Sequence, residues 1–206
     1  MRWIDVAGLP GSGKSELCDQ AWPPRCIDTS SQIEWPSEWA NFLTLTAKYL
    51  KGIEGHPSYR ACESMTKRSF KKMSAVQALN SDKVYTQTGF AQRGLGIAWR
   101  LKDVGKIEEY FRRMPVSLGI VLLHCGVDEL RRRNIARGKD RSHMLVPMAP
   151  AMLIASTILS KRGIPVLDLN VEQPIEVCRA RLNEFICTAS VPCDGSLGLS
   201  DQMALL

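Results

Sequence analysis

The feature that most constrains this chain is an eight-residue stretch near its N-terminus, Gly8 to Ser15, with the sequence Gly-Leu-Pro-Gly-Ser-Gly-Lys-Ser. It fits the pattern of glycine, four residues, glycine, lysine, then serine or threonine. Glycines at this spacing let backbone N–H groups turn inward around phosphate oxygens, and the following helix presents its positive end to the same anion. The expected backbone cradle comprises Gly8, Pro10, Gly11, Ser12 and Gly13. Lys14 is expected to reach the terminal phosphates and Ser15 to bind Mg²⁺.

The residues that flank this loop fit the same interpretation. Residues 2–7 predict a short strand that enters the loop, and residues 14–21 predict a helix that leaves it. A phosphate-binding loop needs both neighbours, because the strand fixes the loop and the helix supplies its N-terminal N–H groups. The alternative, a glycine-rich surface turn that matches the pattern by chance, needs neither.

Length and composition place one globular domain around this loop. The chain has 206 residues, of which 45% are hydrophobic and 23% are charged, so one α/β core is expected. The net charge of +6 favours polyanionic partners, namely nucleotides and nucleic acid. The seven cysteines form no Cys-x-x-Cys pair, which favours reduced thiols. Without a signal peptide or an apolar run of about 18 residues, we expect a soluble cytoplasmic protein with no membrane partner.

Beyond the loop, strand-like and helix-like segments alternate. Further strands are expected at residues 25–28, 83–88, 116–124 and 164–169. Helices are expected at residues 37–51, 57–79, 89–101, 104–114, 128–141, 149–161 (with Pro150 at its start) and 174–186. This alternation predicts a parallel sheet packed against helices. Residues 188–206 carry little pattern and are expected to be a C-terminal tail.

Asp28 ends the second predicted strand. Ligands gather at the carboxyl ends of parallel strands, so Asp28 is expected on the same rim as the phosphate loop. This position makes it the best candidate for an acid that takes part in chemistry. The alternative is that Asp28 caps the next turn together with Thr29 and Ser30.

The helix predicted over residues 57–79 carries a basic stripe, formed by Arg60, Lys67, Arg68, Lys71 and Lys72. On a helical wheel these cations cover an arc of about 140°. We expect Arg60, Lys67 and Lys71 to contact a phosphate-bearing substrate, on a segment that lies between the second and third strands. The alternative is a solvated basic face.

The third strand ends in Gln87 and Thr88, where many phosphate-loop enzymes carry an acid that orders the metal through water. The missing acid weighs against hydrolysis as the main activity and favours Asp28 as the working carboxylate. Gln87, Gln92 and Arg93 are expected at the strand's rim, where hydrogen bonds and charge would hold substrate. The alternative for Gln92 and Arg93 is a place on the surface of a helix's first turn.

Residues 128–141 begin with two acids and contain five arginines. The helix macrodipole favours acids at the start and cations at the end, which explains part of the pattern. Arg133 and Arg137 are four residues apart on one helix face, where they repel unless an anion lies between them. We expect a mobile lid over about residues 128–147 that brings an arginine onto a transferring phosphoryl group. The alternative is a plain basic helix.

These parts in this order resemble the nucleoside and nucleotide kinase branch of phosphate-loop proteins, over residues 1–187. The resemblance implies a three-layer α/β phosphate-loop NTPase fold, with a five-stranded parallel sheet ordered 2-3-1-4-5 and helices on both faces. It also implies ATP and Mg²⁺ as cofactors, held by Lys14 and Ser15. Asp28 would accept the acceptor's proton, Arg133 and Arg137 would be lid arginines, and the turn from Asn170 to Gln173 would edge the adenine. Residues 37–80 would form the acceptor-binding segment.

Thr88-Gly89-Phe90-Ala91-Gln92-Arg93 echoes the Asp-Gly-Phe-Pro-Arg run of adenylate kinases but lacks its acid. With Asp28 as a base and a basic acceptor segment, the chain resembles kinases that act on hydroxyls. These include polynucleotide kinases and the bacteriophage kinases that phosphorylate 5-hydroxymethyluracil in DNA. The main expectation is therefore an ATP-dependent kinase acting on a hydroxyl of a nucleotide or of DNA, in the host cytoplasm if viral. Two alternatives stay open: a small-molecule nucleoside, nucleotide or sugar kinase, and an ATPase without an acceptor.

Overall fold

The structure is a computed structural model, and it describes residues 3–21, 60, 64, 84–86, 89–101 and 104–189. The strand predicted at residues 25–28, the helix predicted at residues 37–51 and the tail beyond residue 189 lie outside these residues. Four predicted site residues also lie outside them: Asp28, Lys67, Lys71 and Gln87. Of the predicted basic stripe, the structure describes Arg60, which is helical and exposed.

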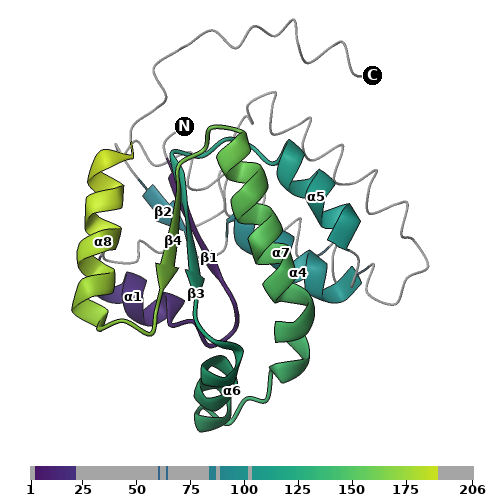
Figure 1. The fold of residues 1–206 in the computed structure, drawn as a ribbon, viewed down its shortest axis with the longest axis vertical. Helices are drawn as coiled ribbons and strands as arrows, with labels where there is room; N and C mark the ends of the chain where they lie inside the picture. The colour runs from purple at the N-terminus through teal and green to yellow at the C-terminus, as the bar shows by residue number, and fades with distance from the viewer. Residues whose placement is uncertain are drawn as a thin grey trace, which may run out of the picture.

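The described strands form one parallel sheet with the order β2-β1-β3-β4 (Figure 1). Their bounds are Trp3–Gly8 for β1, Val84–Thr86 for β2, Gly119–His124 for β3 and Val166–Asn170 for β4. This is the order predicted for the first, third, fourth and fifth strands of the sheet. Because the predicted second strand lies outside the described residues, the five-stranded order stays a prediction.

Helices cover both faces of the sheet (Figure 1). One face carries α1 (Lys14–Ala21) and α8 (Ile175–Thr188). The other carries α4 (Phe90–Leu101), α5 (Val104–Arg113) and α7 (Ser142–Lys161). The alternation of side chains along β1 sets this division, because Ile4 packs with the α1 and α8 side while Trp3 packs with the α4, α5 and α7 side. The parallel sheet with helices on both faces is therefore confirmed.

The single helix predicted over residues 128–141 is wrong. The structure has α6 over Val127–Ala136, a short connection, and then α7 from Ser142. The chain turns at Gly138, which has φ of +66°, a conformation that ends a helix at low cost only for glycine. The basic run is therefore divided between the end of α6 and the connection that follows.

The start predicted for the next helix is also wrong. α7 begins at Ser142, seven residues before the predicted start at Ala149, so Pro147 and Pro150 both lie inside it. A proline removes one helix hydrogen bond and kinks or ends an unsupported helix. Here the apolar side of α7 offsets that cost, because residues such as Met148 and Ala155 are buried in the core shared with α4 and α5.

Within the described residues, α7 is also the one helix long and apolar enough to cross a membrane by length and composition alone. The helix has 20 residues, and its most apolar window of 18 residues has a mean hydropathy of 1.5. In the fold it packs against α4 and α5, and seven of its residues are buried. Length and composition of this kind are shared by core helices. One side of α7 is buried in the core, whereas Val146 and Leu153 on its other side are exposed.

Candidate functional site

The phosphate loop follows β1 directly and is held open by two glycines in the left-handed region. Gly11 has φ of +89° and Gly13 has φ of +75°. The N–H of Ser12 donates to the carbonyl of Leu9 at 3.1 Å, and the N–H of Leu17 donates to that of Gly13 at 2.9 Å, which starts α1. Residues other than glycine rarely adopt such φ values. The backbone conformation of the loop therefore explains why glycines stand at these two positions.

The Lys14 ammonium folds back over this loop. Its Nζ donates to the carbonyl oxygens of Gly8 at 2.7 Å and Leu9 at 3.2 Å, and lies 3.4 Å from the hydroxyl of Ser12. Burial lowers the pKa of Lys14 from 10.5 to about 8; Cys18 opposes this shift and the positive charge of Arg141 adds to it. A partly buried ammonium that touches mainly neutral acceptors gains from an anion, so the electrostatics of the loop favour phosphate binding.

A pair of hydrogen bonds joins β1 and the phosphate loop to the start of α4. The N–H of Gly8 donates to the side-chain oxygen of Gln92 at 2.9 Å, and the N–H of Ala91 donates to the buried carboxylate of Asp5 at 2.6 Å. Gly89 lies so close that a Cβ there would fall 2.6 Å from an Asp5 oxygen. The amide oxygen of Gln92, which was predicted to hold substrate, therefore contacts the loop itself. The substrate roles predicted for Gln92 and Arg93 stay predictions.

A cavity of about 340 Å³ opens beside the phosphate loop. Three parts of the chain line it: the loop and α1, helix α6, and the segment that joins β4 to α8. The lining residues are Ser12, Gly13, Glu16, Leu17, Glu129, Arg132, Arg133, Arg137, Val171, Gln173, Ile175 and Cys178. The volume is within the usual range for small-molecule sites.

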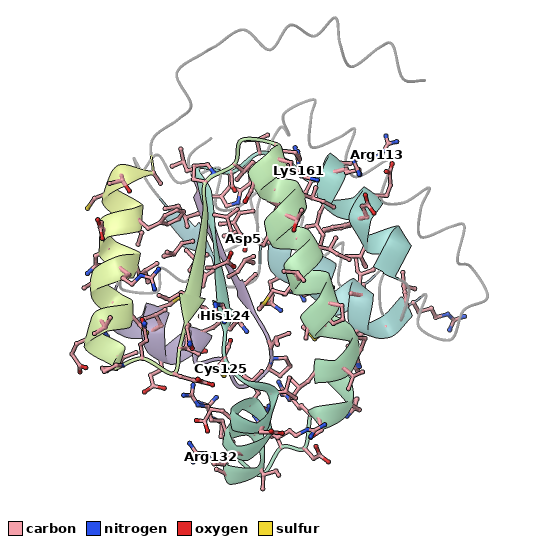
Figure 2. The ribbon with its side chains drawn as sticks, in the orientation of Figure 1. Asp5, Arg113, His124, Cys125, Arg132 and Lys161 are labelled. Atoms are coloured by element: carbon pink, nitrogen blue, oxygen red, sulfur yellow. The ribbon has the colours of Figure 1, made fainter. Side chains whose placement is uncertain are left out.

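The cavity lies where parallel sheets bind ligands, beyond the carboxyl ends of the strands. β1 is flanked by β2 on one side and β3 on the other, so the strand order reverses there and leaves a crevice. In Figure 2, His124, Cys125 and Arg132 lie toward this end of the sheet, whereas Arg113 and Lys161 lie at the opposite end. The structure thus brings the predicted loop, arginines and adenine-side turn to one place.

Two of the cavity arginines, Arg132 and Arg133 on α6, are oriented by Glu129. Its carboxylate accepts two hydrogen bonds from Arg132, both at 2.7 Å, and one from Arg133 at 2.6 Å. These hydrogen bonds lower the pKa of Glu129 to about 2. Arg133 also donates to the carbonyl oxygen of Val171 at 3.1 Å. Arg133 thus bridges α6 and the turn after β4, at the cavity wall.

The turn after β4 is shaped by Asn170, which was predicted to edge the adenine. The side-chain oxygen of Asn170 accepts from the N–H of Glu172 at 2.9 Å, and Glu172 in turn accepts from the N–H of Gly126 at 2.7 Å. The residues of this turn that line the cavity are Val171 and Gln173. The side-chain contact of Asn170 is therefore internal to the turn, and the role of Asn170 toward a base stays a prediction.

Sequence reasoning missed four residues of the site: Glu129 and Arg132 in the cavity wall, and Asn134 and Asp5, which contact the loop and the start of α4. Asn134 on α6 donates to the carbonyl of Pro10 at 3.0 Å, and Asp5 holds the start of α4. A charged residue within an otherwise apolar strand is the one sequence feature that could have indicated Asp5. Asn134 stands between arginines in a helix, where no local pattern distinguishes it.

Ser15, predicted to bind Mg²⁺, is exposed on the first turn of α1, beside Lys14. Among the described residues no group of three or more His, Cys, Asp or Glu side chains could hold a metal ion. The role of Ser15 toward Mg²⁺ stays a prediction.

Together, the parallel sheet, the glycine loop at the end of its central strand and the adjoining cavity define a phosphate-loop nucleotide-binding fold. The chain shares this fold with deoxyadenosine kinase from M. mycoides. A structure of that kinase with the products dCMP and a flexible dCDP matches with a TM-score of 0.51 and 12% identity over 90% of this chain and 99% of the kinase. A second structure, with bound dCTP, matches with a TM-score of 0.50 and 10% identity over 90% and 99%. No protein-family model and no curated protein sequence matches the chain.

Proposed function

We propose that this protein is an ATP-dependent kinase that transfers the γ-phosphoryl group of ATP to a hydroxyl of a nucleoside. The cavity carries the proposal, because it joins the phosphate loop to Arg133 and Arg137 and to the turn at Val171 and Gln173. A triphosphate on the loop would place its charge beside the arginines. Its base would then extend toward the turn after β4.

The reaction needs an acceptor hydroxyl, a base and a site for the departing ADP. The hydroxyl oxygen attacks the γ-phosphorus, its proton passes to the carboxylate of Asp28, and the bond between the γ-phosphorus and the bridging oxygen of ADP breaks. Lys14 and the arginines stabilise the negative charge spread over the transferring group. Mg²⁺, held by Ser15 and phosphate oxygens, would neutralise part of the same charge. The part assigned to Asp28 comes from its sequence position alone.

We propose a free nucleoside, and not DNA, as the acceptor. Deoxyadenosine kinase has the same fold, and its name states a free nucleoside as its substrate. The basic stripe that favoured DNA lies largely outside the described residues, and its described member, Arg60, is exposed, as it would be on any solvated face. A kinase of hydroxymethylated DNA is the competing outcome that the experiment must separate.

The test is phosphoryl transfer from radiolabelled γ-phosphate ATP to a panel of nucleosides, nucleotides, plain DNA and hydroxymethylated DNA, with Lys14→Ala as the inactive control. We expect labelled nucleoside monophosphate, formed at a rate that changes little with salt. If DNA becomes labelled, and the rate of labelling falls steeply as salt rises, the acceptor is DNA and not a nucleoside. Release of phosphate without transfer to any acceptor would refute the proposal.

A further inference from the structure

Asn134 is a buried polar residue that joins α6 to the phosphate loop. The residue is 4% exposed. Its Nδ2 donates to the carbonyl oxygens of Pro10 at 3.0 Å and Leu130 at 2.8 Å. A side-chain amide nitrogen carries two hydrogens, so both are used. One bond lies within α6, and the other crosses to the loop, 124 residues away in the chain.

Gly11 allows the loop to approach this side chain. A Cβ on Gly11 would lie 2.9 Å from the Asn134 Nδ2 and 3.2 Å from the Leu130 carbonyl oxygen. Glycine is therefore needed here for close approach as well as for its positive φ. The backbone of the phosphate loop packs directly on one turn of α6.

The backbone of Asn134 also fixes the end of α6. Its carbonyl oxygen accepts from the N–H groups of Arg137 at 3.2 Å and Lys139 at 3.0 Å. Arg133 precedes it in the chain, and both Arg133 and Arg137 line the cavity with Ser12 of the loop. One residue thus sets the position of two cavity arginines relative to the phosphate loop.

We infer that Asn134 is a positioning residue that couples the phosphate loop to the cavity arginines. The inference rests on the proposed function in so far as those arginines act on a bound triphosphate. Without the bond to Pro10, the loop keeps Lys14 and its own N–H groups, but α6 is no longer held in register with it. With the bond, a ligand that orders the loop also orders α6 and its C-cap residue, Arg137.

Asn134→Ser separates this coupling from the integrity of α6. A serine hydroxyl can donate to the carbonyl four residues earlier, that of Leu130, but is too short to reach Pro10. The matched control is Asn183→Ser, at an exposed asparagine on α8. We expect both variants to keep the wild-type circular dichroism spectrum. Asn134→Ser should bind MgATP about tenfold more weakly, the effect expected when a buried hydrogen bond is lost and its acceptor is left unpaired.

A double-mutant cycle measures the coupling. If Asn134 acts in part through Arg137, Asn134→Ser combined with Arg137→Ala loses less affinity for MgATP than the product of the two single losses. Arg131→Ala is the control, because Arg131 is an exposed cation of α6 that pairs with Asp128 and does not line the cavity. The inference is supported if the loss of MgATP affinity caused by Asn134→Ser multiplies with that of Arg131→Ala but not with that of Arg137→Ala. Losses that multiply with both would overturn it.

Hydrogen exchange without nucleotide distinguishes this inference from the proposed function. In Asn134→Ser, exchange is expected to rise in peptides that cover residues 9–13 and residues 131–139, whereas Asn183→Ser leaves both unchanged. A wild-type protein that binds no MgATP would refute the proposed function. Unchanged exchange in Asn134→Ser would overturn the coupling, whatever the wild-type protein binds.

Discussion

The backbone N–H of Gly8 donates to the side-chain oxygen of Gln92 at 2.9 Å, across 84 residues of chain. This bond holds the first glycine of the phosphate loop against the first turn of α4. It gives Gln92 a role in positioning the loop, which differs from the substrate-binding role expected of it from the sequence. The two roles have different kinetic consequences.

Gln92→Ala is expected to raise the KM for ATP about three- to tenfold, because one part-buried N–H of the loop loses its acceptor. The KM for the acceptor should change little. Gln92→Glu keeps an acceptor oxygen at the same place and serves as the matched variant, with a smaller effect on the KM for ATP. Steady-state kinetics with each substrate varied in turn decides the point. A rise confined to the KM of the acceptor would support the substrate-binding role instead.

Gly11→Ala is expected to destabilise the fold by about 3 kcal/mol, because it adds a close contact to backbone strain. Its Cβ would lie 2.9 Å from the Asn134 amide, in a residue with φ of +89°. The matched control is Gly138→Ala: Gly138 has φ of +66° but no atom within 4 Å of its Cβ position, so strain alone should cost about 1 kcal/mol.

Thermal unfolding of the two glycine variants tests this comparison. For a domain of this size each kcal/mol lowers Tm by about 2–4 °C, so Gly11→Ala should melt well below Gly138→Ala. Equal shifts in Tm would mean that the loop does not pack against α6 as closely as the structure has it.

The affinity for MgATP is expected to fall above about pH 8. Burial lowers the pKa of the Lys14 ammonium to about 8, so the unbound protein loses this charge as the pH rises through that value. Bound phosphates favour the charged form, so binding above pH 8 requires uptake of a proton, and affinity drops by up to about tenfold per pH unit. Lys14→Arg stays charged and should show a flat profile between pH 8 and 10. Titration calorimetry across this range measures both; a flat wild-type profile would contradict the pKa.

The lowered pKa of Lys14 also makes the free energy of unfolding depend on pH. Because the folded pKa of Lys14 lies below the unfolded value of 10.5, the unfolded chain binds more protons between about pH 8 and 10.5. The contribution of Lys14 to the free energy of unfolding therefore rises with pH in this window and is lowest below pH 8. Denaturant unfolding of wild type and Lys14→Met at pH 7.5 and 9.5 measures the difference. A contribution that falls with pH would contradict the burial of this ammonium.

Asp28→Asn is expected to lower kcat about 10²- to 10⁴-fold while the Kd for ATP stays near the wild-type value, because a general base acts in the transfer step and not in ATP binding. Single-turnover transfer and equilibrium binding report the two quantities separately. An unchanged rate would remove Asp28 from the mechanism.

The parts of this fold that could be predicted from sequence are those encoded by neighbours in the chain. Gly11 and Gly13 mark a backbone with positive φ, and the apolar run before His124 marks a buried central strand, so the loop and most of the sheet follow from short segments. The last helix, α8, follows in the same way, because Cys178 and Leu182 repeat at helical spacing.

The parts that could not be predicted depend on packing between distant segments. Pro147 and Pro150 argue locally against a helix, and only the burial of α7 against α4 and α5 overrides them. The bonds from Gln92 to Gly8 and from Asn134 to Pro10 join residues 84 and 124 positions apart. Short-range periodicity carries no information about such pairs.

The most direct measurement of the central claim is equilibrium titration of wild-type protein and Lys14→Ala with AMP, ADP and ATP in the presence of Mg²⁺. If the glycine loop and the α6 arginines form one site for a triphosphate, affinity for the wild-type protein rises with each added phosphate. The same series should rise less steeply for Lys14→Ala, which keeps the loop N–H groups and the arginines but loses the ammonium. Equal affinities of the wild-type protein for AMP and ATP, or no binding of any of the three, would contradict the account.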